Sequence, residues 1–153
     1  MKHNIAPDAS AFLETLINQP LCYGLKSPDT ELYDFGFGKM VEVVSWRGKK
    51  KTMCTHTIHV ICRFEIIRKT GTPHVERYYE DTSYIKFHHD IRPLIGLCIK
   101  RIALSDKNDL WLDLGDYWIV FVTFENEDES WRFFVADREK THLVASDVWL
   151  RFE

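Results

Sequence analysis

Two sets of charged residues with the order Asp, Arg, Asp recur along the chain. The first set is Asp34, Arg63 and Asp81, and the second is Asp113, Arg132 and Asp147. Both sets begin in similar stretches, Leu32-Tyr33-Asp34-Phe35-Gly36 and Trp111-Leu112-Asp113-Leu114-Gly115. The planar fork of an arginine guanidinium matches carboxylates and phosphates. The pattern therefore indicates a pair of related polar binding sites, one in each half of the chain.

A structural interpretation of the same pattern is simpler, and we favour it. In each half, the arginine and its carboxylates could tie neighbouring strands together at a sheet edge. The spacing between matched residues shrinks along the chain, which longer loops in a first copy would produce. We therefore expect one domain, residues 1–153, with repeat units at about 31–85 and 109–152. The six residues are candidates for binding, and none is expected to be catalytic.

Histidine and cysteine side chains do not predict a metal centre. His56 and His59 are three residues apart on an expected strand, so they point to opposite faces. Cys54, His56 and Cys62 would share one face, but six residues of strand separate Cys62 from His56 by roughly 20 Å. His88, His89 and Asp90 are adjacent, and adjacent side chains diverge. We expect neither a metal nor a cofactor.

The sequence also lacks the local features of a hydrolase. Ser130, His142 and Asp147 could be assembled into a catalytic trio, but no glycine-flanked turn surrounds Ser130. The four cysteines lack the short spacing of a zinc site. Since no export signal is found, we expect them to be free thiols in the cytoplasm.

Composition and charge exclude several classes of protein. The 153 residues are 45% hydrophobic and 28% charged, which is typical of a globular domain. Residues 1–75 contain 10 Lys and Arg against 7 Asp and Glu, whereas residues 76–153 contain 10 against 16. The densest basic run, residues 49–51, is too narrow for a nucleic-acid surface. No apolar run reaches the roughly 18 residues that span a bilayer. We expect no nucleic-acid or membrane partner.

Hydrophobic periodicity predicts one helix followed by strands. Phe12, Leu13, Leu16 and Ile17 form a helical stripe that Pro7 and Asp8 open and Pro20 ends. Residues 87–93 read as a connection between the units. Alternation predicts strands at residues 40–46, 55–68, 75–79, 94–104, 110–114, 117–124, 130–135 and 143–152. The expected fold is α+β and mainly antiparallel β, with the N-terminal helix packed on sheet built from two related β-meander units.

Tryptophan is concentrated in the second half of the chain, at positions 111, 118, 131 and 149. These residues occupy alternating positions of expected strands, so we expect them mostly to build the core. Any that remain on an open sheet face could form an interaction surface, because tryptophan dominates binding hot spots.

Several segments resemble a group of small, uncharacterised bacterial proteins. The similarity extends from about Phe12 to the C-terminus, and it rests on residues 32–38, 59–63, 129–134 and 146–149. The resemblance implies no established activity and transfers no catalytic residues. Some such proteins accompany toxin genes, so the resemblance implies an immunity-type role.

We therefore expect a non-enzymatic, cytoplasmic protein that binds another protein, with the acidic second half steering a basic partner. The alternative is a small-molecule-binding protein or enzyme whose pocket lies between the two repeat units, near Arg63 and Arg132. A binding protein should present an acidic and aromatic surface around residues 106–129. A ligand-binding protein should present a concave pocket lined by the repeated Arg and Asp residues.

Overall fold

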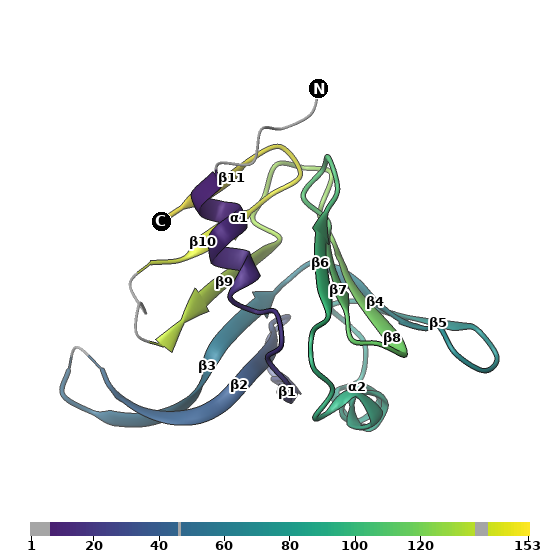
Figure 1. Ribbon diagram of the computed structural model, residues 1–153, viewed down its shortest axis with the longest axis horizontal. Helices are drawn as coiled ribbons and strands as arrows, with labels where there is room; N and C mark the ends of the chain where they lie inside the picture. The colour runs from purple at the N-terminus through teal and green to yellow at the C-terminus, as the bar shows by residue number, and fades with distance from the viewer. Residues whose placement is uncertain (1–6, 46, 137–140) are drawn as a thin grey trace.

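A computed structural model describes residues 7–45, 47–136 and 141–153, which form two antiparallel sheets and two α-helices (Figure 1). The α+β, mainly antiparallel β class expected from the sequence is confirmed. In chain order the elements are α1 (Pro7–Glu14), β1 (Leu21–Lys26), β2 (Tyr33–Val44), β3 (Lys50–Val60), β4 (Arg63–Arg68), β5 (His74–Tyr78), α2 (Tyr84–Ile91), a 3₁₀ turn (Arg92–Leu94), β6 (Arg101–Leu104), β7 (Leu110–Asp113), β8 (Tyr117–Val122), β9 (Trp131–Val135), β10 (Leu143–Ala145) and β11 (Leu150–Phe152).

Each sheet contains strands from both halves of the chain. The six-stranded sheet has the order β1-β2-β3-β9-β10-β11, and the five-stranded sheet has the order β5-β4-β8-β7-β6. Three successive strands of each half therefore lie in one sheet, and the strands that follow cross to the other. The two expected meander units do not form separate sheets, because the crossing after β3 and the crossing after β8 interleave them.

The first crossing divides what the sequence pattern presents as one strand over residues 55–68. The ladder of β3 ends at Val60, and β4 begins at Arg63 in the other sheet. Between them, the backbone N–H groups of Ile61 and Cys62 both donate to the carbonyl of Ser130, at 3.0 and 3.3 Å. The alternation of side chains continues through the break, so alternation alone could not locate it.

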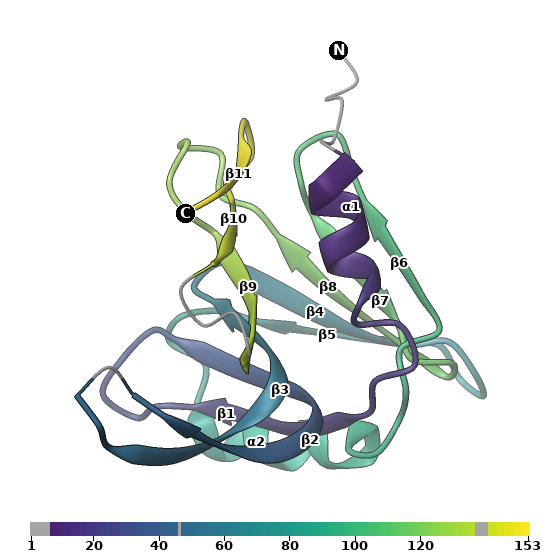
Figure 2. The ribbon, with the colours of Figure 1, turned by 60° about the vertical axis from the view of Figure 1, so that its left-hand side comes forward.

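The helices lie at opposite ends of the space between the sheets (Figures 1 and 2). The expected N-terminal helix is confirmed, although α1 ends at Glu14 and only shorter turns continue to Asn18. Helix α2 was missed by the sequence prediction, which took residues 87–93 as a connection. The Ser83 hydroxyl caps it by accepting from the Ile85 N–H, and Phe87 and Ile91 bury one face. Neither helix of the described residues has the length and apolarity to cross a bilayer.

An aromatic cluster centred on Phe64 of β4 joins the two sheets. The Phe64 ring lies 4.6 Å from Tyr33 and 5.3 Å from Phe35, both of which belong to β2. It also contacts Tyr78, Phe87 and Phe121, at 4.8, 5.7 and 6.0 Å between ring centroids. Most of these pairs meet edge to face, a favoured geometry for aromatic rings. The core is therefore continuous between the sheets.

A β-bulge in β2 accompanies a change in the direction in which β3 side chains point from the six-stranded sheet. Phe37 pairs with His56 and Met40 pairs with Cys54, so Gly38 and Lys39 together oppose Thr55 alone. Gly38 adopts φ +94°, a conformation that glycine tolerates. Cys54 Sγ lies beside Gly36, on the face opposite to Phe37 and His56, so the expectation that Cys54 shares a face with His56 was wrong.

Candidate binding face

The outer face of the five-stranded sheet, the side turned away from the core, carries two of the six candidate residues, Arg63 and Asp113, and Asp81 follows β5 at its edge. Phe64, Ile66, Ile119 and Phe121 point into the core. Strand alternation therefore turns their neighbours outward. The outer face is made of Arg63, Glu65 and Ile67 of β4, Val75 and Arg77 of β5, Arg101 and Ala103 of β6, Trp111 and Asp113 of β7, and Trp118, Val120 and Val122 of β8.

Two tryptophans form the centre of this face. Trp111 and Trp118 meet edge to face with 5.7 Å between ring centroids, and both are only partly buried. Val120 lies on the same face and is 2% exposed. The Lys69 ammonium lies 4.6 Å from the Trp118 ring centroid. The expectation that the four tryptophans mostly build core was wrong, since only Trp131 is fully buried.

Asp113 has a structural role at one end of the outer face. Its carboxylate accepts from Lys69 Nζ at 2.7 Å, from Arg101 Nε at 3.0 Å and from the Gly115 N–H at 2.9 Å. Burial alone would raise the pKa of Asp113, but these donors hold it below its usual value. The contacts tie β6, β7 and the end of β4 together, but through Lys69 and Arg101 and not through Arg132, the arginine of the same set.

Arg63 and Asp81 line a recess at the opposite end of the outer face. The recess has a volume of about 880 Å³ and is bounded by residues 61, 63, 79–81, 107, 109 and 122–125. Asp109 is fixed in its wall, because its carboxylate accepts from the Thr123 N–H at 2.8 Å and from the Thr123 hydroxyl at 3.0 Å. No hydrogen bond or ion pair joins the charged groups of Arg63 or Asp81 to another side chain in the described part of the chain.

Asp34 and Arg132 lie instead on the outer face of the six-stranded sheet. His59 stands between them, because Asp34 pairs with His59 across β2 and β3, and His59 pairs with Arg132 across β3 and β9. His59 Nε2 lies 3.8 Å from Asp34 Oδ1, and the Tyr23 hydroxyl donates to the same oxygen at 3.4 Å. Burial raises the pKa of Asp34 to about 6. Burial and the nearby Arg132 charge lower the pKa of His59.

The Arg132 guanidinium is already occupied by side chains of the second half. It donates to both carboxylate oxygens of Glu129, at 2.6 and 2.8 Å, and to His142 Nδ1 at 2.8 Å. The imidazole of His142 stacks on Phe134 with 4.5 Å between ring centroids. A bidentate pair of this kind fixes the orientation of the fork. Arg132 is thus a structural residue, and it does not line the recess that contains Arg63.

The trio considered for hydrolysis, Ser130, His142 and Asp147, is not arranged for catalysis. The Asp147 carboxylate accepts from the Glu127 N–H at 3.1 Å and so closes a turn. The Ser130 hydroxyl is buried and accepts from the Phe124 N–H at 2.9 Å, while His142 is held by Arg132. Each member of the trio therefore has a separate structural partner.

Sequence order matches Asp34 of the first half with Asp113 of the second half. The strand register matches Asp34 with a different residue. Arg132 is connected through His59 to Asp34, whereas Arg63 pairs with Val122 of β8. The β7–β8 ladder ends at the pair of Leu110 with Phe121, and Asp109 is the residue just before it. If the register is continued by one residue, Asp109 and not Asp113 takes the position that Asp34 has relative to Arg132. The internal duplication itself stays a prediction.

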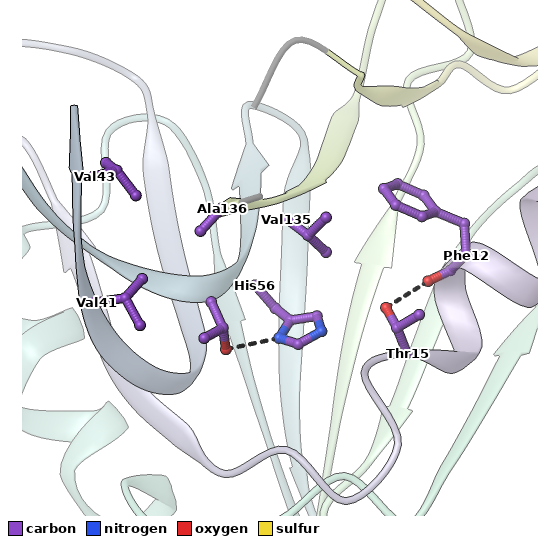
Figure 3. A pocket seen from close by; sticks show the side chains of 8 residues that line it. Phe12, Thr15, Val41, Val43, His56, Val135 and Ala136 are labelled. Atoms are coloured by element: carbon purple, nitrogen blue, oxygen red, sulfur yellow. Dashed lines mark hydrogen bonds between the residues drawn. The ribbon is translucent and has the colours of Figure 1, made fainter. Parts of the chain in front are cut away.

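A second, apolar pocket of about 490 Å³ lies between α1 and the protruding part of the β2–β3 hairpin. Figure 3 shows Phe12 and Thr15 on one side of it and Val41 and Val43 on the other, with His56 at its base. The Thr55 hydroxyl lies 2.9 Å from His56 Nδ1 and 3.2 Å from the Phe37 carbonyl. Because the carbonyl can only accept, Thr55 donates to it, and His56 Nδ1–H donates to Thr55. None of the six candidate residues lines this pocket.

Replacement of Asp34 by Asn is expected to stabilise the protein by about 1–2 kcal/mol at pH 7.5. The raised pKa, about 6 against 3.8, means that the folded state holds the charged carboxylate at a cost above pH 6. The cost to the folded state grows as pH rises from 3.8 to about 6, so at pH 4 the gain should fall to about 0.5 kcal/mol or less. The expected gain is smaller than the free energy that corresponds to the whole pKa shift, because the Asp34 side chain is 31% exposed and solvent screens its charge.

Urea denaturation of the Asp34→Asn variant at pH 7.5 and pH 4 measures this difference. Asp29→Asn, at an exposed turn carboxylate, serves as the control and should change stability little at either pH. An equal effect of Asp34→Asn at both pH values would contradict the assignment of the gain to burial of charge.

The residues that join the candidates into a surface lie within residues 106–129, the range in which an acidic and aromatic surface was expected from the sequence, but they were not singled out there as site residues. Asp109, Lys107 and the Trp111–Trp118 pair complete the outer face and its recess. Comparison of the chain with protein-family models, with curated proteins and with solved structures finds no match. The function therefore has to be inferred from the geometry of the chain.

Proposed function

We propose that this protein is a protein-binding domain that docks a basic segment of its partner on the outer face of the five-stranded sheet. The observation that carries the proposal is the partly exposed Trp111–Trp118 pair beside the charged recess. Tryptophans that remain accessible on a sheet face are the side chains most often found as binding hot spots. Both helices pack elsewhere, which leaves this face to a partner.

The charges of the recess favour a basic partner. Four carboxylates line it against two cationic side chains: Glu80, Asp81, Asp109 and Glu125 against Arg63 and Lys107. Tyr79, which is 43% exposed, and Phe124 add aromatic surface. An arginine or lysine of the partner would find both carboxylates and ring faces there. Excess negative charge would also speed association with a basic surface.

The cellular setting is part of the same proposal. All four cysteines are free thiols, which is typical of the reducing cytoplasm. A protein toxin that the domain neutralises is the partner that the sequence resemblance implies. Blocking such a protein requires a stable surface and no catalytic group.

A small-molecule-binding role is the second candidate, and the recess itself favours it. Its volume of about 880 Å³ is within the range of ligand pockets, and it lies between residues of the two halves, as that alternative predicts. It contains Arg63 and Asp81 of the first set but not Arg132. A ligand with both cationic and anionic groups would suit this lining.

Affinity capture from the native host with matched surface variants tests the proposal. The Trp111→Ala/Trp118→Ala variant removes the aromatic centre, and Glu80→Lys/Asp81→Lys reverses the charge of the recess. Partners that the wild type retains should bind each variant at least about tenfold more weakly, because hot-spot residues contribute about 2 kcal/mol or more. Binding should also weaken as salt is raised.

Phe152→Ala is the control, since it removes an exposed aromatic side chain from β11, in the other sheet. Every partner should bind this variant as tightly as the wild type. If binding is lost equally in Phe152→Ala, or survives both face variants, the assigned face is wrong. If no protein is retained and a small molecule co-purifies in an Asp81-dependent manner, the second candidate replaces the first.

A further inference from the structure

Three sulfur atoms gather on the outer face of the six-stranded sheet, each from a different strand. The Cys54 thiol of β3 donates to the Met40 thioether of β2, with 3.2 Å between the sulfurs. The Cys22 thiol of β1 lies within hydrogen-bonding reach of Cys54. Cys22 also donates to the Gly38 carbonyl at 2.6 Å, which holds its sulfur over β2.

The fold, and not the sequence spacing, assembles this group. The bulge at Gly38 turns Cys54 away from the apolar pocket and toward the outer face. There the Cys54 sulfur lies over Gly36. A Cβ added at Gly36 would lie 2.8 Å from that sulfur and 2.4 Å from the Tyr23 ring. A second register shift, between Leu21 and Tyr23, displaces Cys22 on the neighbouring strand. Glycine at position 36 thus leaves the space that the sulfurs occupy.

The three sulfur-containing side chains differ in how far they are exposed to solvent. Cys54 is fully buried, Cys22 is partly buried, and Met40 is 51% exposed. The methionine is therefore the side of the group that is in contact with solvent. In the described part of the chain, no group of three or more His, Cys, Asp or Glu side chains could hold a metal. The third donor here is a thioether, which lies outside those four residue types.

We propose that Cys22, Met40 and Cys54 form a binding site for a single Cu(I) ion. Thiolate and thioether sulfurs are soft ligands that select Cu(I). With metal–sulfur bonds of about 2.3 Å, three sulfurs around one ion in a plane lie roughly 4 Å apart. The 3.2 Å contact between Cys54 and Met40 needs only a small separation to reach that spacing. Zn²⁺ would require a fourth ligand for its tetrahedral geometry.

Binding at this site requires the loss of two protons. The two S–H bonds break, two Cu–S bonds form with the thiolate electron pairs, and both protons go to solvent. The thioether adds a third bond without losing a proton, and copper stays Cu(I). Because two protons are released for each ion bound, the affinity should rise with pH, by up to about 100-fold per pH unit.

Anaerobic titration with Cu(I), in competition with bathocuproine disulfonate, tests the site. The wild type should bind one Cu(I) per chain and release two protons. Cys22→Ser and Cys54→Ser should each weaken binding by about 100-fold or more, and Met40→Leu by about tenfold. Met40 is exposed, so Met40→Leu keeps the test valid even if the Cys54 variant folds poorly. Cys62→Ala, at a buried thiol outside the group, is the control and should bind as the wild type does.

Three outcomes would overturn the proposal. Binding that is unchanged in Met40→Leu and Cys22→Ser would show that the sulfur group is not the site. Equal loss in Cys62→Ala would indicate non-specific thiol binding. Zn²⁺ bound at equal or higher affinity under the same conditions would contradict the selection of Cu(I).

Discussion

Replacement of Phe64 by Ala is expected to lower the free energy of unfolding by about 4 kcal/mol, because truncation of a buried aromatic ring leaves a cavity. Phe64 has no solvent exposure and touches five other aromatic rings. Tyr33 and Phe35 belong to one sheet, and Phe121 belongs to the other. Since a domain of this size is stable by about 5–15 kcal/mol, the variant should lose a large part of its stability.

Urea denaturation followed by fluorescence and by far-UV circular dichroism measures the effect. Phe152→Ala, at a ring that is 40% exposed, is the control and should cost about 1 kcal/mol or less. Because the aromatic cluster spans both sheets, we expect the two probes to give coincident transitions in both proteins. Separate transitions for tryptophan fluorescence and backbone signal would contradict the single domain, residues 1–153, expected from the sequence.

Local patterns in the sequence were sufficient to predict most strands and the fold class. The strands at residues 110–113, 117–122 and 131–135 fall within their predicted ranges because turns with Gly, Asp and Asn separate them. The same patterns could not predict which sheet each strand joins. The break at residues 61–62 depends on hydrogen bonds to Ser130, a residue of the other half. Such long-range pairing leaves no signal in local periodicity.

Candidate residues were predicted less well than the strands, for a related reason. The Asp…Arg…Asp sets were matched by order along the chain, but contact is decided by register. Arg63 and Asp81 meet at one recess, whereas Arg132 is bound to Glu129 and Asp113 to Lys69. The tryptophans were assigned to the core because alternation does not say which face of a strand is covered. That depends on where the helices pack.

Replacement of Gly38 by Ala is expected to destabilise the protein by about 3 kcal/mol. Gly38 has φ +94°, and a Cβ there would lie 1.8 Å from Thr55 Oγ1. The cost combines a strained backbone with overpacking against a strand that cannot move freely. Gly48→Ala is the matched control, because Gly48 has φ +76° but nothing within 4 Å of its added Cβ. It should lose only the backbone part, about 1–2 kcal/mol.

A double-mutant cycle with Thr55→Ala separates the two contributions to the cost at Gly38. Thr55→Ala removes the hydroxyl that the new Cβ would meet, so Gly38→Ala should cost clearly less in that background. The residual cost should approach that of Gly48→Ala, which measures the backbone conformation alone. If Gly38→Ala costs the same in both backgrounds, the contact with Thr55 contributes nothing. The bulge would then depend on glycine only for its left-handed backbone. If it costs no more than Gly48→Ala in the wild type, β2 can accept a side chain at the bulge. The register that brings Cys54 to the outer face would then not depend on Gly38.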